Sequence, residues 1–506
     1  MGCRGTSRRK AVTRRWRKYR RASWLIAVGS LLALALVPAL APAQVATKAV
    51  KPGSQAQGPT EKCFWGTPEA NIGPLDHLGE TVGPGGQLGP DTNVVYYYSR
   101  FQLPAGATVT LHGQFPHSRF MSFTSYKTVG GEPGIAASAM SDFEISPDAG
   151  SVNPYLPGES RKAKHRSFTL TISGQTPPAE PAPNTLYVGQ EGHTEETQQV
   201  ELVERIYRND KNLATNGGVP LPAPTYNPTE GGPVADEAGV CSALSVVSGA
   251  ENIVTTKIGV PSATYVKLRS ELPGTKEPAT HPATNPIRWE RFFNSGYLVA
   301  PFYRGTALEG LIGGLNSESK PGFYPTPANA YISAYASRLF GPNAEGHNIL
   351  VLHAKMPTHP TTYNNDKVNN SGGTQLRYWS ISNYTAISKN TLLEAGSTSL
   401  FDEQVPTNIH DEYTIVVSLP EDRPKNAKAG CGVAWMDWGN AGDKEGRPDL
   451  DLLTIRNQLS SPSFEQSIEK VMHPGEEEAV MGSYYPHGTY MTKQEFEARR
   501  CWSANG

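Results

Sequence analysis

The chain contains one octet twice, as RFMSFTSY at 119–126 and as RYWSISNY at 377–384. Both copies fit the pattern Arg-aromatic-x-Ser-x-x-x-Tyr. LHGQFPH precedes the first copy and LHAKMPTH the second, while RSFTLTISG and DEYTIVVSLP follow them in the same order. Features that recur in one order along a chain indicate the duplication of a single fold unit.

The runs around the octets alternate between apolar and polar residues, and corners rich in Gly, Pro, Asn and Asp separate them. A period of two is typical of half-buried strands. With 50 Gly and 42 Pro in 506 residues, we expect few long helices. The sequence therefore predicts a mainly β protein: two tandem antiparallel jelly-roll-like β-sandwiches from an internal duplication, joined by a partly helical connector, with short C-terminal helices.

The duplicated runs place the first sandwich at 85–225 and the second at 325–485. A Pro/Gly-rich linker and a helical connector fill 226–324 between them. An N-terminal segment at 44–84 precedes the sandwiches, and a capping helix at 486–506 follows them.

Helix signals occur in the connector at Ala238–Ser248 and in PSATYVKLRSEL (261–272), and in three further short segments near the connector and the C-terminus. They are PIRWERFFNSG (286–296), SPSFEQSIEKV (461–471) and TKQEFEARRC (492–501). In the last of them, Thr492 and Glu495 have the spacing of a capping box.

Residues 1–43 have the composition of a secretory signal peptide. Basic residues crowd into Met1–Arg21, an apolar run covers Trp24–Val37, and Ala41-Pro42-Ala43 offers a cleavage site. The export route is Sec or twin-arginine, and a retained signal anchor is the alternative. We therefore expect a secreted, cell-surface or periplasmic protein with no stable membrane span after cleavage.

Removal of this segment changes the charge balance. The chain has 46 Lys/Arg and 47 Asp/Glu, and ten of the basic residues lie in Met1–Arg21, so 36 basic residues would remain against 47 acidic ones. A chain this acidic gains nothing from counterion release on a phosphate backbone. We expect no nucleic-acid partner.

Four cysteines lie beyond the signal segment, and an even number in an oxidising compartment predicts two disulfides. Three pairings are open. Because chain termini often lie close together, we favour Cys63–Cys501 with Cys241–Cys431.

The two faces of each octet differ in character. On a strand, Met121 and Phe123 point to one face with Arg119 and Ser125, and we expect that face to pack into a core. The other face reads aromatic, hydroxyl, hydroxyl, aromatic in both copies. A buried hydroxyl without a partner costs about 1–3 kcal/mol, so this face suits a wet groove. The predicted ligand-binding residues are Arg119, Phe120, Ser122, Tyr126, Arg377, Tyr378, Ser380 and Tyr384; the alternative is that they only maintain the fold.

The order RFQLPAGATVTLHGQFPHSRFMSFTSY, PDAGSVNP and RSFTLTI is similar to exported bacterial proteins built of tandem jelly-roll domains of unknown function. The likeness covers both copies. It implies the fold and an extracytoplasmic location, and it brings no catalytic residues with it.

Carboxylates and histidines offer two further kinds of site. Asp437 lies within the aromatic run Trp435–Trp438, and Asp443, Asp449 and Asp451 follow it. These carboxylates, with Asp437, Asp443 and Asp449 as the candidates, could serve glycoside hydrolysis, bind structural Ca²⁺ or form a solvated loop. Four histidines occupy matched places in the two copies: His112, His117, His353 and His359. They are weak candidates for metal ligands, with copper as the metal, and the alternative is that they are structural residues beside the Pro corners. We predict no cofactor, with a Ca or Cu ion as the alternative.

The favoured function is that of an extracytoplasmic protein that binds an extracellular polar polymer or glycan in an inter-sheet groove. The alternatives are a secreted hydrolase of a glycoside or polymer that uses the Asp carboxylates, and a His-ligated metal-dependent oxidative enzyme. The sequence leaves open whether the protein is an enzyme.

Overall fold

The structure is a computed structural model and describes residues 63–65, 91–129, 132–189, 196–229, 239–246, 282–293, 326–343, 345–364, 373–386, 395–439, 442–499 and 501. The predicted signal peptide, most of the predicted N-terminal segment and most of the predicted connector lie outside these residues. Among the described helices, none is long and apolar enough to cross a membrane.

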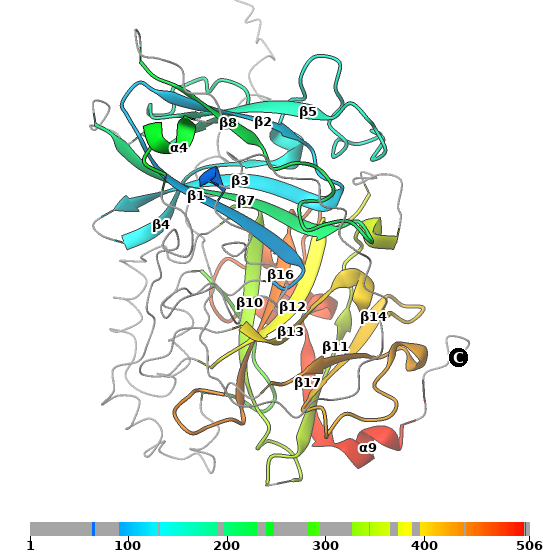
Figure 1. Cartoon of the computed structure of the whole chain (residues 1–506). Coiled ribbons are helices and arrows are strands. Elements are labelled where there is room, and N and C mark those ends of the chain that lie inside the picture. The colour runs from blue at the N-terminus through cyan, green and yellow to red at the C-terminus, as the bar shows by residue number, and fades with distance from the viewer. Residues whose placement is uncertain are drawn as a thin grey trace, which may run out of the picture.

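Eight strands build the first unit, which covers the described residues up to 246. They are β1(Val94–Leu103), β2(Thr108–Gln114), β3(Ser118–Val129), β4(Glu132–Ser141), β5(Ser167–Ser173), β6(Thr185–Tyr187), β7(Gln198–Asn209) and β8(Ala223–Asn227). One sheet has the order β1-β7-β3-β4 and the other the order β6-β5-β2-β8 (Figure 1).

The second unit covers the described residues from 282 onward. Its strands are β9(Glu290–Arg291), β10(Asn329–Ser337), β11(Asn348–Lys355), β12(Tyr378–Tyr384), β13(Ala395–Phe401), β14(Glu412–Ser418), β15(Ala434–Asp437), β16(Leu450–Gln458) and β17(His487–Thr492). They form the sheets β13-β12-β16-β10-β9 and β15-β14-β11-β17. The last strand thus lies beyond 485, where we expected the second sandwich to end.

The two units have one topology. If β1 to β8 are matched in order with β10 to β17, both sheets show the same neighbours in both units, and the short β9 is an addition at the edge of the second unit. The register agrees as well, because Ser122 lies opposite Arg205 in the first unit and Ser380 opposite Arg456 in the second. This agreement is what an internal duplication predicts.

Most strand pairs are antiparallel, so the mainly β, multi-sheet prediction is confirmed. The jelly-roll part of the prediction is not confirmed, because each unit contains one parallel pair of strands. β5 pairs with β6 and β14 with β15 in parallel, whereas a jelly roll is an antiparallel architecture.

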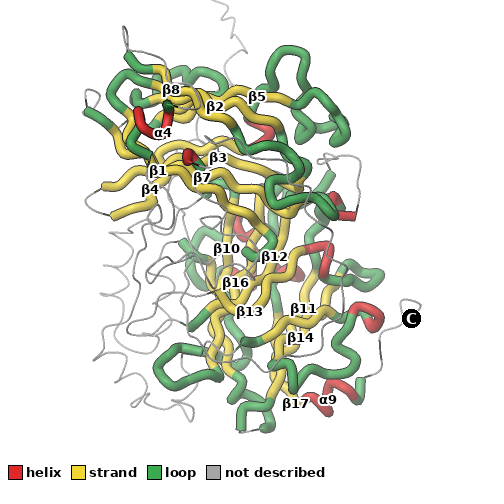
Figure 2. Tube along the Cα trace, in the orientation of Figure 1, coloured by secondary structure: helices red, strands yellow, loops and turns green. Residues whose placement is uncertain are grey.

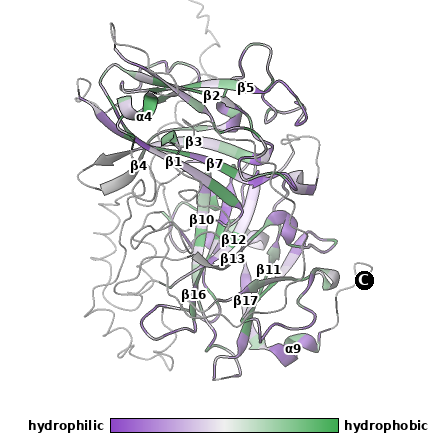
Figure 3. Cartoon of the chain, in the orientation of Figure 1, coloured by the Kyte–Doolittle hydropathy of each residue, from purple (hydrophilic) through white to green (hydrophobic). Residues whose placement is uncertain are grey.

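Alternating burial makes each unit a sandwich. β2 and β5 bury every second residue, and Leu111 and Leu170 meet in register between them. Apolar side chains from both sheets join one buried cluster in the first unit, and a second such cluster lies in the second unit. Figure 3 shows the hydrophobic stretches along the strands. Each fully buried Leu or Phe contributes about 1.5–3 kcal/mol of stability.

The helices are short, and loops connect most strands (Figure 2). They are the α-helices α4(Val240–Ala243), α8(Glu477–Met481) and α9(Lys493–Glu497), and the 3-10 helices η4(Asp142–Glu144), η7(Thr362–Asn364), η8(Asp402–Gln404), η9(Ala429–Cys431), η10(Ile468–Lys470) and η11(Gly482–Tyr484).

The helix predictions have mixed outcomes. α9 begins at the predicted Thr492–Glu495 capping box, which is confirmed. The helix predicted at 461–471 is wrong, since only η10 forms there. The helix predicted at 286–296 is also wrong. Its apolar residues Trp289 and Phe292 are buried in the core of the second unit, while Glu290–Arg291 pairs with the edge of β10.

The favoured disulfide pairing is wrong. Cys63 bonds to Cys241 and Cys431 bonds to Cys501, with Cα–Cα distances of 6.2 and 4.5 Å. The bridges do not tie the chain ends together, because each remains within one unit. The residues after Cys63 are buried in the core of the first unit, whereas Cys501 follows α9 in the second.

Candidate functional site

The first octet lies on β3 and the second on β12, which begins one residue after Arg377, and their outer faces meet between the units. Met121 and Phe123 are buried in the first core, as their face predicted, and Trp379 is buried in the second. On the opposite face, Phe120 belongs to one buried cluster with residues of the second unit, among them Tyr378. Figure 1 shows the sheet of β3 and β7 lying next to the sheet of β10, β12 and β16.

The first residues of the octets make reciprocal contacts across this interface. Arg119 Nη1 donates to Asp402 Oδ2 of η8 at 3.0 Å. Arg377 Nη1 donates to Asp142 Oδ2 of η4 at 3.3 Å. Each arginine therefore reaches the carboxylate that follows the other unit's octet. Burial raises the pKa of Asp142 to about 6, and the nearby charge of Arg377 opposes that rise.

The same carboxylates also fix the strands on which the octets lie. The main-chain N–H of Met121 donates to Asp142 Oδ2 at 3.1 Å, and that of Trp379 donates to Asp402 Oδ2 at 3.0 Å. Arg119 also pairs with Glu403. The two buried ion pairs therefore join the units and hold the octets in register.

A second pair of matched arginines lies in the same interface. Arg205 Nη2 donates to the hydroxyl of Tyr126 at 2.7 Å, and its Nη1 donates to Thr124 Oγ1 at 3.2 Å. Arg456 donates to Asp91 and, at 3.4 Å, to Ser380 Oγ. Burial raises the pKa of Tyr126, and Arg205 opposes that rise. We did not predict either arginine as a site residue, although each stands in the run that ends its copy, VELVERIYR at 200–208 and LDLLTIRNQ at 450–458.

Tyrosines from both units surround these arginines. The guanidinium of Arg205 lies 5.7 Å from the ring centres of Tyr96 and Tyr126, and Arg456 lies 5.2 Å from that of Tyr331. The rings of Tyr207 and Tyr378 meet edge to face across the interface, 5.3 Å apart. Such distances suit cation–π and aromatic pairing.

We call this buried set the inter-unit layer. It consists of Asp91, Tyr96, Ser122, Thr124, Tyr126, Arg205 and Tyr207 of the first unit with Asn329, Tyr331, Tyr378, Ser380, Ser382, Tyr384, Arg456 and Gln458 of the second. The eight predicted ligand residues all lie in or beside it and are at most 6% exposed. The structure therefore brings them together in a closed layer, and ligand contact there stays a prediction.

Several polar atoms of the inter-unit layer lack a hydrogen-bond partner among the described residues. They are Ser122 Oγ, Asn329 Oδ1, Arg456 Nε and both amide atoms of Gln458. Asn329 and Gln458 lie opposite each other on β10 and β16. Because buried polar groups are nearly always paired, the layer has hydrogen-bonding capacity that the described side chains do not use.

The predicted Asp candidates hold loops of the second unit. Asp437 accepts from the N–H of Gly439, and Asp443 accepts from that of Arg447. Asp449 accepts from the hydroxyl of Ser337 at 2.7 Å. These hydrogen bonds agree with the interpretation that the acidic run forms a loop.

Asp451 belongs to the same acidic run, and the sequence predicts that it could lie around a cleft with the other three carboxylates. It is buried, and burial raises its pKa well above the usual range. The neighbouring charge of Asp437 adds to that rise. Burial also raises the pKa of Asp437. Two neighbouring carboxyl groups with raised pKa values therefore lie at one end of the second sandwich.

The paired histidines do not gather at one place. His112 and His353 occupy matched positions on β2 and β11, each 3.4 Å from a threonine hydroxyl of the neighbouring strand. His117 lies against Arg166, and burial and that arginine lower its pKa. His359 Nδ1 lies 3.5 Å from Asp402 Oδ1. In the described part of the chain, no group of three potential metal ligands occurs.

Comparison with known proteins leaves the family open. No known protein family matches the chain, and no curated protein matches it. It is similar to the crystal structure of an uncharacterized protein from Burkholderia cenocepacia, with 11% identity and a TM-score of 0.39, over 82% of this chain and 80% of that one. It is also similar to the VPA0106 protein from Vibrio parahaemolyticus, with 10% identity and a TM-score of 0.32, over 79% and 89%. At these values neither structure bears on the function of this chain.

Proposed function

We propose that the protein binds a polar, hydroxyl-rich ligand, one or a few sugar units of an extracellular glycan, within the inter-unit layer. The single observation that carries the proposal is the meeting of the two octet faces around matched arginines, with buried polar atoms left over. The two disulfides among the described residues are compatible with the oxidising, extracytoplasmic location that this function requires.

The chemistry of the layer suits a sugar. Tyrosine rings offer flat apolar surfaces with a polar tip, and the hydroxyls of a sugar both donate and accept hydrogen bonds. Ser122 Oγ and the carbonyl oxygen of the Gln458 side chain are acceptors without a described partner, and Arg456 Nε is such a donor. A ligand hydroxyl would satisfy each of these atoms and remove the cost of leaving them unpaired.

Access to the layer has to come from movement, because its residues are buried. The ion pairs of Arg119 with Asp402 and of Arg377 with Asp142 lie where the units join. We expect the ligand to enter when these contacts open and to be enclosed when they close, as in other proteins that bind a ligand between two parts.

A double substitution, Ser122→Ala with Gln458→Leu, tests the proposal. It removes polar atoms that have no described partner, so the fold should be as stable as before or more stable. Binding of a glycan found on a glycan array should weaken about tenfold or more, measured by titration calorimetry. Tyr413→Phe is the control, since this buried tyrosine lies in the core of the second unit and outside the layer. A wild type that binds no glycan, or a double variant that binds as the wild type does, refutes the proposal.

A second candidate, glycan or polymer hydrolysis in the second unit, rests on Asp437 and Asp451. Neighbouring carboxyl groups with raised pKa values favour general acid chemistry. Turnover of chromogenic glycosides by the wild type and by Asp451→Asn distinguishes the two candidates. Equal rates exclude Asp451 from the reaction.

A further inference from the structure

We infer that a second binding site, independent of the inter-unit layer, lies on the outer face of β11, β14 and β17 and takes the carboxyl-terminal residue of a peptide. A pocket of about 240 Å³ opens there. This volume is slightly below the roughly 300–1,000 Å³ of ordinary ligand pockets, so it fits one residue rather than a long ligand.

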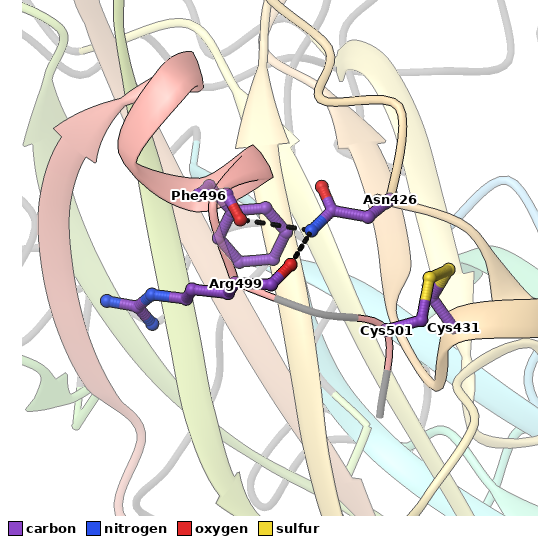
Figure 4. Close-up of a disulfide and its surroundings, with 5 residues drawn as sticks. All are labelled: Asn426, Cys431, Phe496, Arg499 and Cys501. Atoms are coloured by element: carbon purple, nitrogen blue, oxygen red, sulfur yellow. Dashed lines mark hydrogen bonds between the residues drawn. A yellow bond between two sulfur atoms is a disulfide. The ribbon is translucent and has the colours of Figure 1, made fainter. Parts of the chain in front are cut away.

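α9 and a disulfide form one side of this pocket. After β17 the chain turns into α9, and Phe496 packs with Val351, Val433 and Met491 in a small apolar cluster on the outer face of the sheet. The Cys431–Cys501 bond then fixes the chain beyond the helix (Figure 4). The result is an apolar floor, suited to a short side chain, that a covalent bond holds in place.

The rim of the pocket offers hydrogen-bond donors suited to a carboxylate. His353 and His487 lie opposite each other on β11 and β17, and both line the pocket together with Arg499. No Asp or Glu is among the lining residues. Outside the lining, Glu412 lies 3.7 Å from His353 Nε2 and engages that ring in part, and the charge of Arg499 also acts on Glu495. His487 and Arg499 are the donors on which the inference depends. Arginine and imidazole N–H groups are common partners of a carboxylate.

Asn426 supplies an acceptor for an amide N–H. Its Nδ2 donates to the carbonyl oxygens of Phe496 and Arg499 at 3.0 and 2.9 Å, which fixes the orientation of the side-chain amide (Figure 4). Its Oδ1 is shielded from solvent and has no hydrogen-bond partner among the described residues. The last residue of a peptide has a carboxylate, an adjacent N–H and a side chain, which can be short and apolar. Other proteins also bind peptides by their C-terminal carboxylate.

The matched place in the first unit lacks these features. His112 occupies the position of His353 and pairs with a threonine in the same way, but Ala223 stands opposite it where the second unit has His487. The shared fold therefore does not require the second histidine, which belongs to the second unit alone.

N-acetyl-L-leucine is the probe, because it carries the carboxylate, the N–H and the apolar side chain, and N-acetyl-L-leucinamide is its uncharged counterpart. We expect the wild type to bind the acid in a saturable way by NMR titration and to bind the amide at least about tenfold more weakly. His487→Ala and Arg499→Ala should each weaken binding of the acid about tenfold, and His112→Ala should leave it unchanged.

Three results would overturn the inference: no saturable binding of the acid, equal binding of acid and amide, or full binding by both pocket variants. Both altered side chains are exposed, so the variants should melt at the wild-type temperature. The Ser122→Ala/Gln458→Leu variant should still bind the probe. This last measurement separates a failure at the pocket from a failure of the glycan proposal.

Discussion

Arg119 and Arg377 each donate a hydrogen bond to the main-chain carbonyl oxygen of the other, at 3.2 and 3.4 Å. They are the first residues of the two octets, so the duplicated motif contacts its own copy. An exchange of this kind is what a two-fold relation between similar units produces, in which residue i contacts j and j contacts i. The octet is therefore part of the joint between the two sandwiches as well as part of each core.

Removing one of these arginines should cost much stability. Arg377→Ala leaves the buried carboxylate of Asp142 without its ion-pair partner, and breaking a buried pair costs about 3–5 kcal/mol. The free energy of unfolding from urea titration measures the loss. Lys470→Ala is the control, because Lys470 and Glu465 form an exposed pair worth about 0–1 kcal/mol. Equal losses in both variants would show that the reciprocal contact does not stabilise the protein.

Glu204 should make the stability fall as the pH rises. It faces the core of the first unit on β7, and burial raises its pKa from 4.5 to about 8. Between these values the unfolded chain releases the proton while the folded chain keeps it. The stability therefore falls by about 1.4 kcal/mol for each pH unit from 4.5 to 8, and this contribution is constant outside that window.

Glu204→Ile tests this dependence with a side chain that the fold accepts, because Ile455 occupies the matched position in the second unit. The variant should be more stable than the wild type at pH 8 and similar to it at pH 4.5, by urea titration at several pH values. Parallel pH curves for the two proteins would contradict the buried carboxyl group.

Local patterns in the sequence predicted the architecture well. Alternation placed Met121 and Phe123 in the first core, and the repeated order of motifs anticipated one topology in both units. The capping box at Thr492 anticipated α9. Alternation and the capping box are local signals, because each depends on side chains that are near one another in the sequence.

Contacts between distant segments were much harder to anticipate. Strict alternation placed Arg119 on the core face, yet at the beginning of β3 its side chain turns to Asp402 of the other unit. The prediction of the disulfide pairing was wrong for a similar reason, since the partner of Cys63 depends on which unit the N-terminal end of the chain packs against. Asp91 stands in no repeated motif, and Gln458 ends a matched run without sharing its residue type with the other copy. Only the register and the interface bring these two residues to the layer.

The second disulfide should control the order of α9. A five-residue helix is too short to be stable alone, so it depends on Phe496, on Asn426 and on the Cys431–Cys501 bond. Because that bond closes a separation of 70 residues, Cys431→Ala/Cys501→Ala should cost about 4 kcal/mol. Hydrogen exchange should show loss of protection in α9. The matched variant Cys63→Ala/Cys241→Ala should leave α9 protected, and an equal loss in both variants would contradict the local role of the bond.

Loss of the hydroxyl group should lower the stability at Tyr378, in the inter-unit layer, more than at Tyr413, in the core of the second unit. The hydroxyl of Tyr378 donates to the buried carboxylate of Asp91 at 2.7 Å, whereas Tyr413 packs in the core of the second unit beside Trp379. Tyr378→Phe removes a bond to a charged group and should cost about 1.5–3 kcal/mol, while Tyr413→Phe should change the stability by less than about 0.5 kcal/mol. Urea unfolding of both variants gives the comparison. If Tyr378→Phe is as stable as Tyr413→Phe, then the other partners of Asp91, which are Arg456 and Asn93, stabilise its carboxylate without the tyrosine. The tyrosine hydroxyls of the layer would then add specificity rather than stability.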